Sequence, residues 1–190
     1  KVSKGSPGRY GSVALGIYNG GGYHALENNE NKVFESRLTV RPVPDVVPGL
    51  QVSWLLKLGK GNTDAAPDFS VNSAMVSLEN QWYVLTGQYY RGKGNSKGKA
   101  LLPDGRSAPQ QGYSMFAEYR FPHTRWGLIG RYDYFDFNRD SSDQTSTRLI
   151  GGLVYHVAGN HKMILDVDTV EYEDSGERET IGKFTVEVSF

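Results

Sequence analysis

The last nine residues of the chain alternate strictly between polar and apolar side chains after the first glycine. The segment from Gly182 to Phe190 reads Gly-Lys-Phe-Thr-Val-Glu-Val-Ser-Phe. Successive side chains of a β-strand point to opposite faces of a sheet, so this segment predicts a strand with one apolar and one polar face. The same period of two recurs along the chain and constrains the fold more than any other feature. It predicts an all-β protein.

Alternating runs bounded by Gly, Pro, Asn and Asp predict ten strands. They lie near residues 9–19, 33–43, 49–59, 68–78, 81–92, 111–122, 125–137, 145–157, 161–172 and 179–190. A tilted strand needs about 9 to 11 residues to cross the hydrocarbon of a bilayer, and these runs are long enough. Helical periodicity is not persuasive anywhere in the chain. From the alternation and the length of the runs we therefore expect an antiparallel transmembrane β-barrel, with about ten strands in this chain.

The connections between these runs alternate between short and long. Short connections lie at 44–48, 79–80, 122–124 and 158–160, and long ones at 20–32, 60–67, 92–110, 138–144 and 173–178. Bacterial barrels have short periplasmic turns and longer extracellular loops. The alternation therefore predicts that the C-terminus lies on the periplasmic side.

Four of the runs divide their residues between two faces without adjustment. The faces expected to contact lipid carry Leu50, Val52, Trp54, Leu56 and Leu58; Tyr113, Met115, Ala117, Tyr119 and Phe121; Trp126, Leu128, Gly130, Tyr132 and Tyr134; and Leu149, Gly151, Leu153, Tyr155 and Val157. Aromatic residues such as Tyr89, Tyr90 and Trp126 gather near strand ends, as rings do at headgroup depth in membrane barrels. The alternative is that the rings fill the core of a soluble β-sandwich.

Composition is compatible with a barrel and excludes several other classes of site. The 21 basic residues balance the 21 acidic ones, so charge gives no reason to expect nucleic acid. Cysteine is absent, which excludes disulfides, thiolate metal sites and cysteine nucleophiles. The mean hydropathy is −0.50. A barrel strand shows only half of its residues to lipid, so a polar average is expected for one.

Several segments share a pattern with a known family. They are residues 10–22 with Ala-Leu-Gly-Ile-Tyr-Asn-Gly at 14–20, Ser-Arg-Leu-Thr-Val-Arg-Pro at 36–42, the turn at 44–49, Gly-Gly-Leu-Val-Tyr at 151–155, and the final Phe190. In these segments the chain resembles the C-terminal part of the phosphate-selective porin O and P family of outer-membrane porins. The resemblance implies a trimeric or monomeric barrel of about sixteen strands. A complete ten-stranded barrel is the alternative, because an even number of strands can close.

Charged residues fall mainly on the faces opposite the apolar ones, where we expect them to face a lumen. As pore-lining residues we predict Arg37, Lys57, Glu118, Arg120, Arg131, Asp133, Arg148 and Lys183. Side-chain charges in such positions act at close range on permeating ions. The near balance of signs argues against strong charge selection. For any single residue, a solvated wall position or a cross-strand pair is the alternative.

The longest connection is basic, with Asp104 as its lone acid. Its cations are Arg91, Lys93, Lys97, Lys99 and Arg106. If the loop folds into the lumen, these five are candidates for a constriction that attracts anions. If the loop stays outside, they meet lipopolysaccharide phosphates or water.

The sequence predicts no catalytic residue, metal site or cofactor. A hydrolase at the extracellular rim would need Asp and His groups there to activate water. Only His24 lies in an extracellular loop, whereas His123, His156 and His161 lie towards the periplasmic end. The acidic run at 166–174 has the spacing of no calcium loop, so a solvated acidic rim is the better interpretation.

The sequence therefore predicts a porin of the bacterial outer membrane that passes small hydrophilic solutes or ions passively through an aqueous lumen. Expected partners are outer-membrane lipid and lipopolysaccharide, the permeating solutes, and either further copies in a homotrimer or a partner protein. The alternative is a structural barrel that sheathes or anchors a partner, such as an electron-transfer conduit. A rim hydrolase is a distant third.

Overall fold

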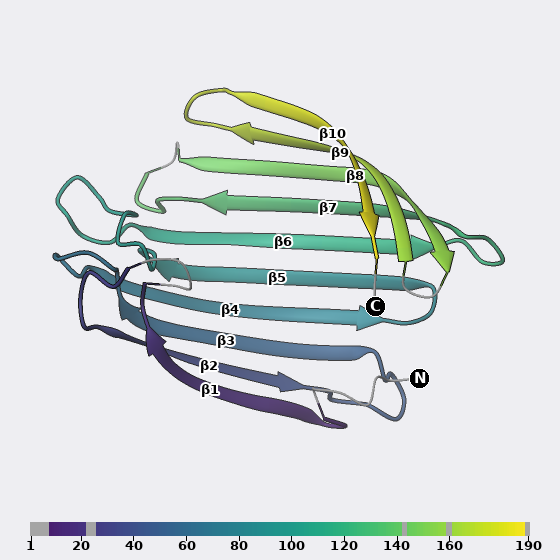
Figure 1. The fold of residues 1–190 in the computed structure, drawn as a ribbon, viewed down its shortest axis with the longest axis horizontal. Helices are drawn as coiled ribbons and strands as arrows, with labels where there is room; N and C mark the ends of the chain where they lie inside the picture. Colours follow the sequence, from purple (N-terminus) through teal and green to yellow (C-terminus); the bar gives the residue numbers. More distant parts are fainter. Residues whose placement is uncertain (1–7, 22–25, 142–143, 159–160, 189–190) are drawn as a thin grey trace.

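The computed structural model describes residues 8–21, 26–141, 144–158 and 161–188. These residues form one antiparallel sheet of ten strands, each paired with its neighbours in chain order (Figure 1). The strands are β1 (Gly11–Asn19), β2 (Lys32–Val40), β3 (Leu50–Lys60), β4 (Asp68–Glu79), β5 (Tyr83–Lys93), β6 (Pro109–Arg120), β7 (Trp126–Asp136), β8 (Thr145–Ala158), β9 (His161–Tyr172) and β10 (Arg178–Glu187). No helix in the described part of the chain is long and apolar enough to span a bilayer.

All ten predicted strands are present, and their bounds differ from the predicted ones by only a few residues. The start of β5 shows one physical reason for a difference. The side chain of Asn80 accepts hydrogen bonds from the backbone N–H groups of Trp82 and Tyr83, at 2.7 and 2.9 Å. Asn side chains that bond the backbone two residues on are typical of turns. The turn therefore extends to Trp82, and the strand begins at Tyr83.

Each strand contributes side chains alternately to two faces, which we call the inner and outer faces. The inner face carries Glu35, Lys57 and Glu118, and the outer face carries Trp54 and Tyr119. The inner face is concave. Lys162 of β9 reaches Glu118 of β6 at 3.2 Å, although strands three apart are separated by about 14 Å along a flat sheet. Only curvature towards the inner face brings these side chains together.

The outer face is apolar and uncovered. Trp54, Tyr119, Tyr132 and Phe184 are 42%, 45%, 36% and 67% exposed. The described residues form a single sheet, so no second layer of this chain packs against the rings. The two-layered sandwich that was the alternative is therefore not the fold of the described chain. Burial is sparse for the same reason: the apolar core comprises only residues such as Val33 and Val154.

The sheet is open. Its order runs from β1 to β10, and no pairing joins these two strands within the described ranges. The expectation of antiparallel all-β architecture is confirmed, whereas the complete ten-stranded barrel is not formed. Both edge strands leave a row of backbone donors and acceptors without a ladder partner in the sheet.

Successive connections lie at opposite ends of the strands (Figure 1). We call the end with the β1–β2, β3–β4, β5–β6, β7–β8 and β9–β10 connections the long-loop end and the other the short-turn end, although the β2–β3 connection at the short-turn end, residues 41–49, is longer than the sequence predicts. At the long-loop end, Asn62 of the β3–β4 loop is buried and joins three loops. Its backbone N–H donates to the Ser96 carbonyl, and its side chain donates to the Leu26 carbonyl and accepts from the Asn28 N–H. These bonds satisfy a buried amide and tie the loops to one another.

One inner-face aromatic pair was missed by the sequence pattern. Tyr90, expected near a lipid-facing strand end, lies on the inner face and stacks on Phe135, with ring centroids 5.7 Å apart. Gly112 of β6 stands between them in the ladder. A Cβ built on Gly112 would lie 2.8 Å from a ring carbon of Phe135. The glycine therefore leaves the space in which two rings from non-adjacent strands meet.

Candidate functional site

The inner face brings together the residues predicted to line a pore. Arg37, Lys57, Glu118, Arg120, Arg131, Asp133, Arg148 and Lys183 all have the inner orientation in the strand register. Seven of these eight form ion pairs in the structure. The eighth, Arg37, has no ion pair or side-chain hydrogen bond within the described ranges, and its side chain is exposed. The inner surface is therefore charged and locally neutralised.

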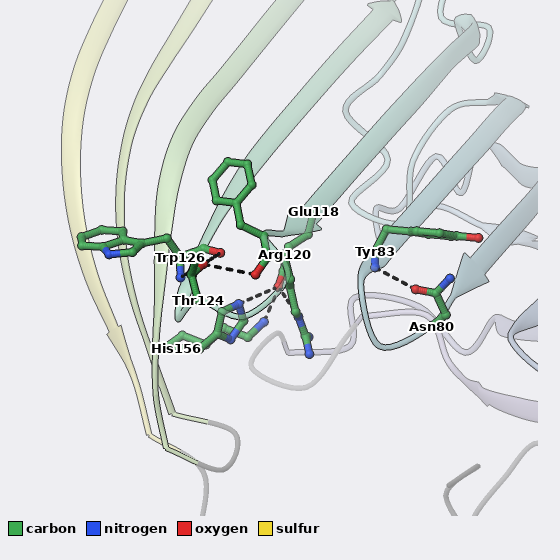
Figure 2. A network of polar contacts seen from close by, with 9 residues as sticks. Asn80, Tyr83, Glu118, Arg120, Thr124, Trp126 and His156 are labelled. Carbon is green, nitrogen blue, oxygen red and sulfur yellow. Dashed lines mark hydrogen bonds and ion pairs between the residues drawn. The ribbon is translucent and has the colours of Figure 1, made fainter.

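Glu118 of β6 is the centre of the largest cluster, near the short-turn end (Figure 2). Its side chain is only 6% exposed and lies 3.1 Å from Arg120 Nε, 3.2 Å from Lys162 Nζ and 3.3 Å from His156 Nε2. Arg120 shares the inner face because it lies two residues further along β6. His156 and Lys162 stand opposite each other in the β8–β9 ladder. One carboxylate thus joins three strands.

Asp168 of β9 is the centre of a second cluster. Its side chain is 4% exposed and accepts two hydrogen bonds from Arg148 of β8, at 2.8 Å to Nε and 2.5 Å to Nη2. Lys183 of β10 donates to the same carboxylate. A guanidinium that binds a carboxylate through two nitrogens is held in a fixed plane. Asp168 therefore fixes the direction of two predicted pore-lining cations.

Two smaller pairs continue the charged surface. Glu35 of β2 binds Lys57 of β3 at 2.8 Å and accepts a hydrogen bond from Tyr18 at 2.7 Å. Arg131 and Asp133 are two residues apart on β7, and Arg131 Nε lies 2.9 Å from Asp133 Oδ2. Over the described ranges, the inner face therefore carries four separate groups of opposite charges, each held together at hydrogen-bonding distance. Such a surface is polar and presents both signs of charge at close range.

The five predicted loop cations do not gather in one place, and Arg91 and Lys93 lie in β5 rather than in the loop. Arg91, Lys93 and Arg106 line a pocket of about 450 Å³ together with outer-face residues of β4. Lys97 and Lys99 are exposed and are not part of that pocket. The turn that carries them packs on the β3–β4 loop through the Ser96 carbonyl. The basic constriction stays a prediction, and three of its candidates lie at the outer side of the loop end.

The acidic run at 166–174 divides between the two faces. Asp166 and Asp168 point to the inner face, whereas Glu171 has the outer orientation. Glu173 accepts a hydrogen bond from the Thr145 hydroxyl. The solvated-rim interpretation is therefore wrong for Asp168, which is buried and paired with Arg148. The period of two along β9 was the signal that would have placed it on the inner face.

Other chemical sites find little support in the part of the chain that the structure describes. It contains no group of three or more His, Asp or Glu side chains that could hold a metal ion. His123 and His156 lie towards the short-turn end, and His161 begins β9 at that end. His24, the residue on which the rim-hydrolase hypothesis rests, is outside the described residues.

Comparisons with known proteins add no assignment to this geometry. No family model, curated protein or solved structure matches the chain. What the inner face does must therefore be argued from its residues alone.

Proposed function

We propose that the protein is a porin of the bacterial outer membrane, which forms an aqueous channel for the passive diffusion of small hydrophilic solutes or ions. The observation that supports it is the contrast between the two faces of one sheet. The outer face exposes rings and aliphatic side chains such as Trp54 and Phe184, and the inner face carries paired charges such as Arg148 and Asp168. Lipid and water are the two solvents that suit these two surfaces.

The open edges fit this proposal if further strands complete the wall. In hydrocarbon, every backbone N–H and C=O must find a partner within the protein, so membrane sheets close into barrels. We propose that the ten strands are part of a larger barrel of about sixteen strands, within the range that outer-membrane porins span. Closure of that kind would pair β1 and β10 with strands beyond the described sheet.

The charge pattern supports a channel with weak ion preference. Glu118 and Asp168 each neutralise more than one cation, and the smaller pairs are balanced. A permeating ion therefore passes local fields of both signs. Arg37 and the partly exposed Arg120, Arg131 and Lys183 are the inner-face cations best placed to act on an anion.

The two-solvent arrangement can be tested with single cysteines, because the chain has none of its own. Ser114→Cys places a thiol on the inner face of β6, and Ala117→Cys places one on the outer face of the same strand. In proteoliposomes, a charged thiosulfonate reagent should modify Cys at 114 and leave Cys at 117 unmodified. A lipid-soluble maleimide should show the reverse preference. Equal modification of both positions by the charged reagent would contradict a lipid-facing outer surface.

Channel function is tested by conductance. The purified full-length protein in planar bilayers should give stepwise ohmic currents with a small reversal potential in a salt gradient. Absence of current, together with a protein that co-purifies in fixed ratio, would favour the structural barrel that sheathes a partner. The cysteine result separates these outcomes from failure to insert, because both kinds of barrel expose Ala117 to lipid.

A further inference from the structure

A second charged site lies on the opposite side of the sheet from the inner face. The pocket of about 450 Å³ is lined by Ser70 and Asn72 of β4, by Arg91 and Lys93 of β5, and by residues of the β5–β6 and β7–β8 loops. Asn72 accepts a hydrogen bond from the indole of Trp54, an exposed outer-face residue, at 2.7 Å. The strand residues of the pocket therefore belong to the outer face, at its long-loop end.

Positive charge exceeds negative charge in this pocket. Four cations line it, Arg91, Lys93, Arg106 and Arg139, against the single carboxylate of Asp140. On the inner face, by contrast, the carboxylates of Glu118 and Asp168 hold most of the cations. A surplus of cations around a concave, partly enclosed space raises the local concentration of anions.

The cations of the pocket differ in how far they are already engaged. Lys93 lies 3.1 Å from Asp68, which also binds Lys60, and Arg106 lies 2.6 Å from Asp104. The backbone N–H and the side chain of Arg106 bond to Asp104 and hold the pKa of this carboxyl below its usual value, so it stays ionised. Arg91 has no ion pair or side-chain hydrogen bond in the described ranges. Arg91 is therefore available to a ligand.

Arg139 supplies a buried donor that has no acceptor in the described part of the chain. Its backbone N–H bonds to the Pro109 carbonyl at 2.9 Å, which holds the residue at the pocket. Its Nε is buried and has no hydrogen-bond partner among the described residues. A buried N–H that bonds nothing is costly, so a shift of this guanidinium, which lines the pocket, that brings Nε to an anion there would be favoured. Arginine is the side chain whose fork of donors matches phosphate geometry.

The position of the pocket indicates what carries the anion. Along β5, Tyr89 lies two residues from Arg91 on the same face and is 46% exposed. Tyr113 of β6, its partner in the ladder, is also exposed and stacks on Tyr134. Apolar surface, then a row of rings, then cations follow one another towards the loop end. This order matches a lipid from acyl chain to headgroup.

We propose that this pocket binds the phosphate group of a lipid headgroup, through Arg91 and Arg139, in the leaflet next to the long loops. The inference rests on the proposed function, because it places the outer face in lipid. It adds a specific binding site, with the two residues that bind the phosphate, to the general contact of the outer face with the membrane.

The test uses the purified full-length protein in detergent, with dioleoyl phosphatidate as probe and dioleoyl phosphatidylcholine as a lipid with the same acyl chains. Bound lipid is counted by native mass spectrometry. R91Q and R139Q should each weaken phosphatidate binding about tenfold, as expected for the loss of one charge-assisted hydrogen bond. The matched control is K97Q/K99Q, which removes two charges from the neighbouring β5–β6 loop outside the pocket and should change binding less than about twofold.

Three results would overturn the proposal, and the first is phosphatidate binding that R91Q leaves unchanged. Equal loss of phosphatidate binding in the pocket variants and in the control would show general attraction to a basic loop. Inorganic phosphate that binds alone as tightly as phosphatidate, with the same dependence on Arg91 and Arg139, would show a site for free phosphate.

Conductance measured on the same preparations keeps the two proposals apart. If current is present and R91Q leaves phosphatidate binding unchanged, only the pocket proposal is refuted. If current is absent and R91Q weakens phosphatidate binding, only the channel proposal is refuted.

Discussion

The two faces of the sheet use the same strands in opposite ways. On the inner face, neighbouring side chains pair by charge, as Glu118 does with Arg120 and Lys162. On the outer face, side chains such as Met115 and Leu153 are exposed and make no such pairs. Curvature widens the contrast, because it brings inner-face groups of distant strands together and spreads the outer-face groups apart. One wall thus has a connected polar side and a disconnected apolar side.

The strongest test of this contrast is a charge placed on each face of one strand. We expect Met115→Arg, on the outer face at the middle of β6, to lower the free energy of unfolding in liposomes by about 2 to 4 kcal/mol, the cost of an arginine near the bilayer midplane. Ser114→Arg, on the inner face next to Asp133 in the ladder, should change it by less than about 1 kcal/mol. Urea titrations followed by tryptophan fluorescence measure both. Similar losses would mean that the faces do not differ in solvent.

The second test breaks the connected side. Glu118→Gln leaves Arg120, Lys162 and His156 close together without their shared carboxylate. We expect a loss of about 2 kcal/mol in stability, less than for a fully buried pair because the partners are partly exposed. The control is Asp133→Asn, which breaks a single and more exposed pair with Arg131 and should cost under about 1 kcal/mol. If both variants unfold at the same urea concentration, the cluster adds nothing beyond separate pairs.

The third test compares glycines on the two faces. A Cβ at Gly112, on the inner face, would lie 2.7 Å from the Tyr134 carbonyl and 2.8 Å from Phe135. We expect Gly112→Ala to cost about 1 to 2 kcal/mol through overpacking of the Tyr90–Phe135 stack. Gly130, on the outer face, has open space around the same position, so Gly130→Ala should be tolerated within about 0.5 kcal/mol. A larger loss at 130 than at 112 would contradict the packing described for the inner face.

The smallest expected change in stability belongs to the one predicted pore-lining residue without an ion pair in the described chain. Arg37→Glu should alter the unfolding free energy by less than about 0.5 kcal/mol, since the side chain is exposed. It should nevertheless move the reversal potential in a salt gradient towards cation preference, because charges on a pore wall act on passing ions. The outer-face change Leu15→Glu is the electrical control. An unchanged reversal potential in R37E would show that Arg37 does not line the permeation path.

Much of this arrangement was predictable because a strand has an exact sequence period. Alternation located all ten strands and placed Arg131 and Arg148 on the same side as Glu118. Turn residues such as Asn80 predicted where the strands end. Two residues were assigned to the wrong environment although the period of two places both on the inner face: Tyr90 was grouped with lipid-facing aromatics, and Asp168 with a solvated rim. The environment of each depends on side chains of other strands, Phe135 of β7 for Tyr90 and Arg148 of β8 for Asp168.

The sequence by itself determined the period, the strand ends and the division of residues between two faces, because all three are local properties of an extended backbone. Which groups meet was decided by the tertiary structure alone. Lys162 reaches Glu118 across two intervening strands because the sheet curves. Arg91 and Arg139 line one pocket because the β5–β6 and β7–β8 loops come together beside the outer face of β4 and β5. Such contacts depend on the path of the whole chain in space. No stretch of neighbouring residues encodes that path alone.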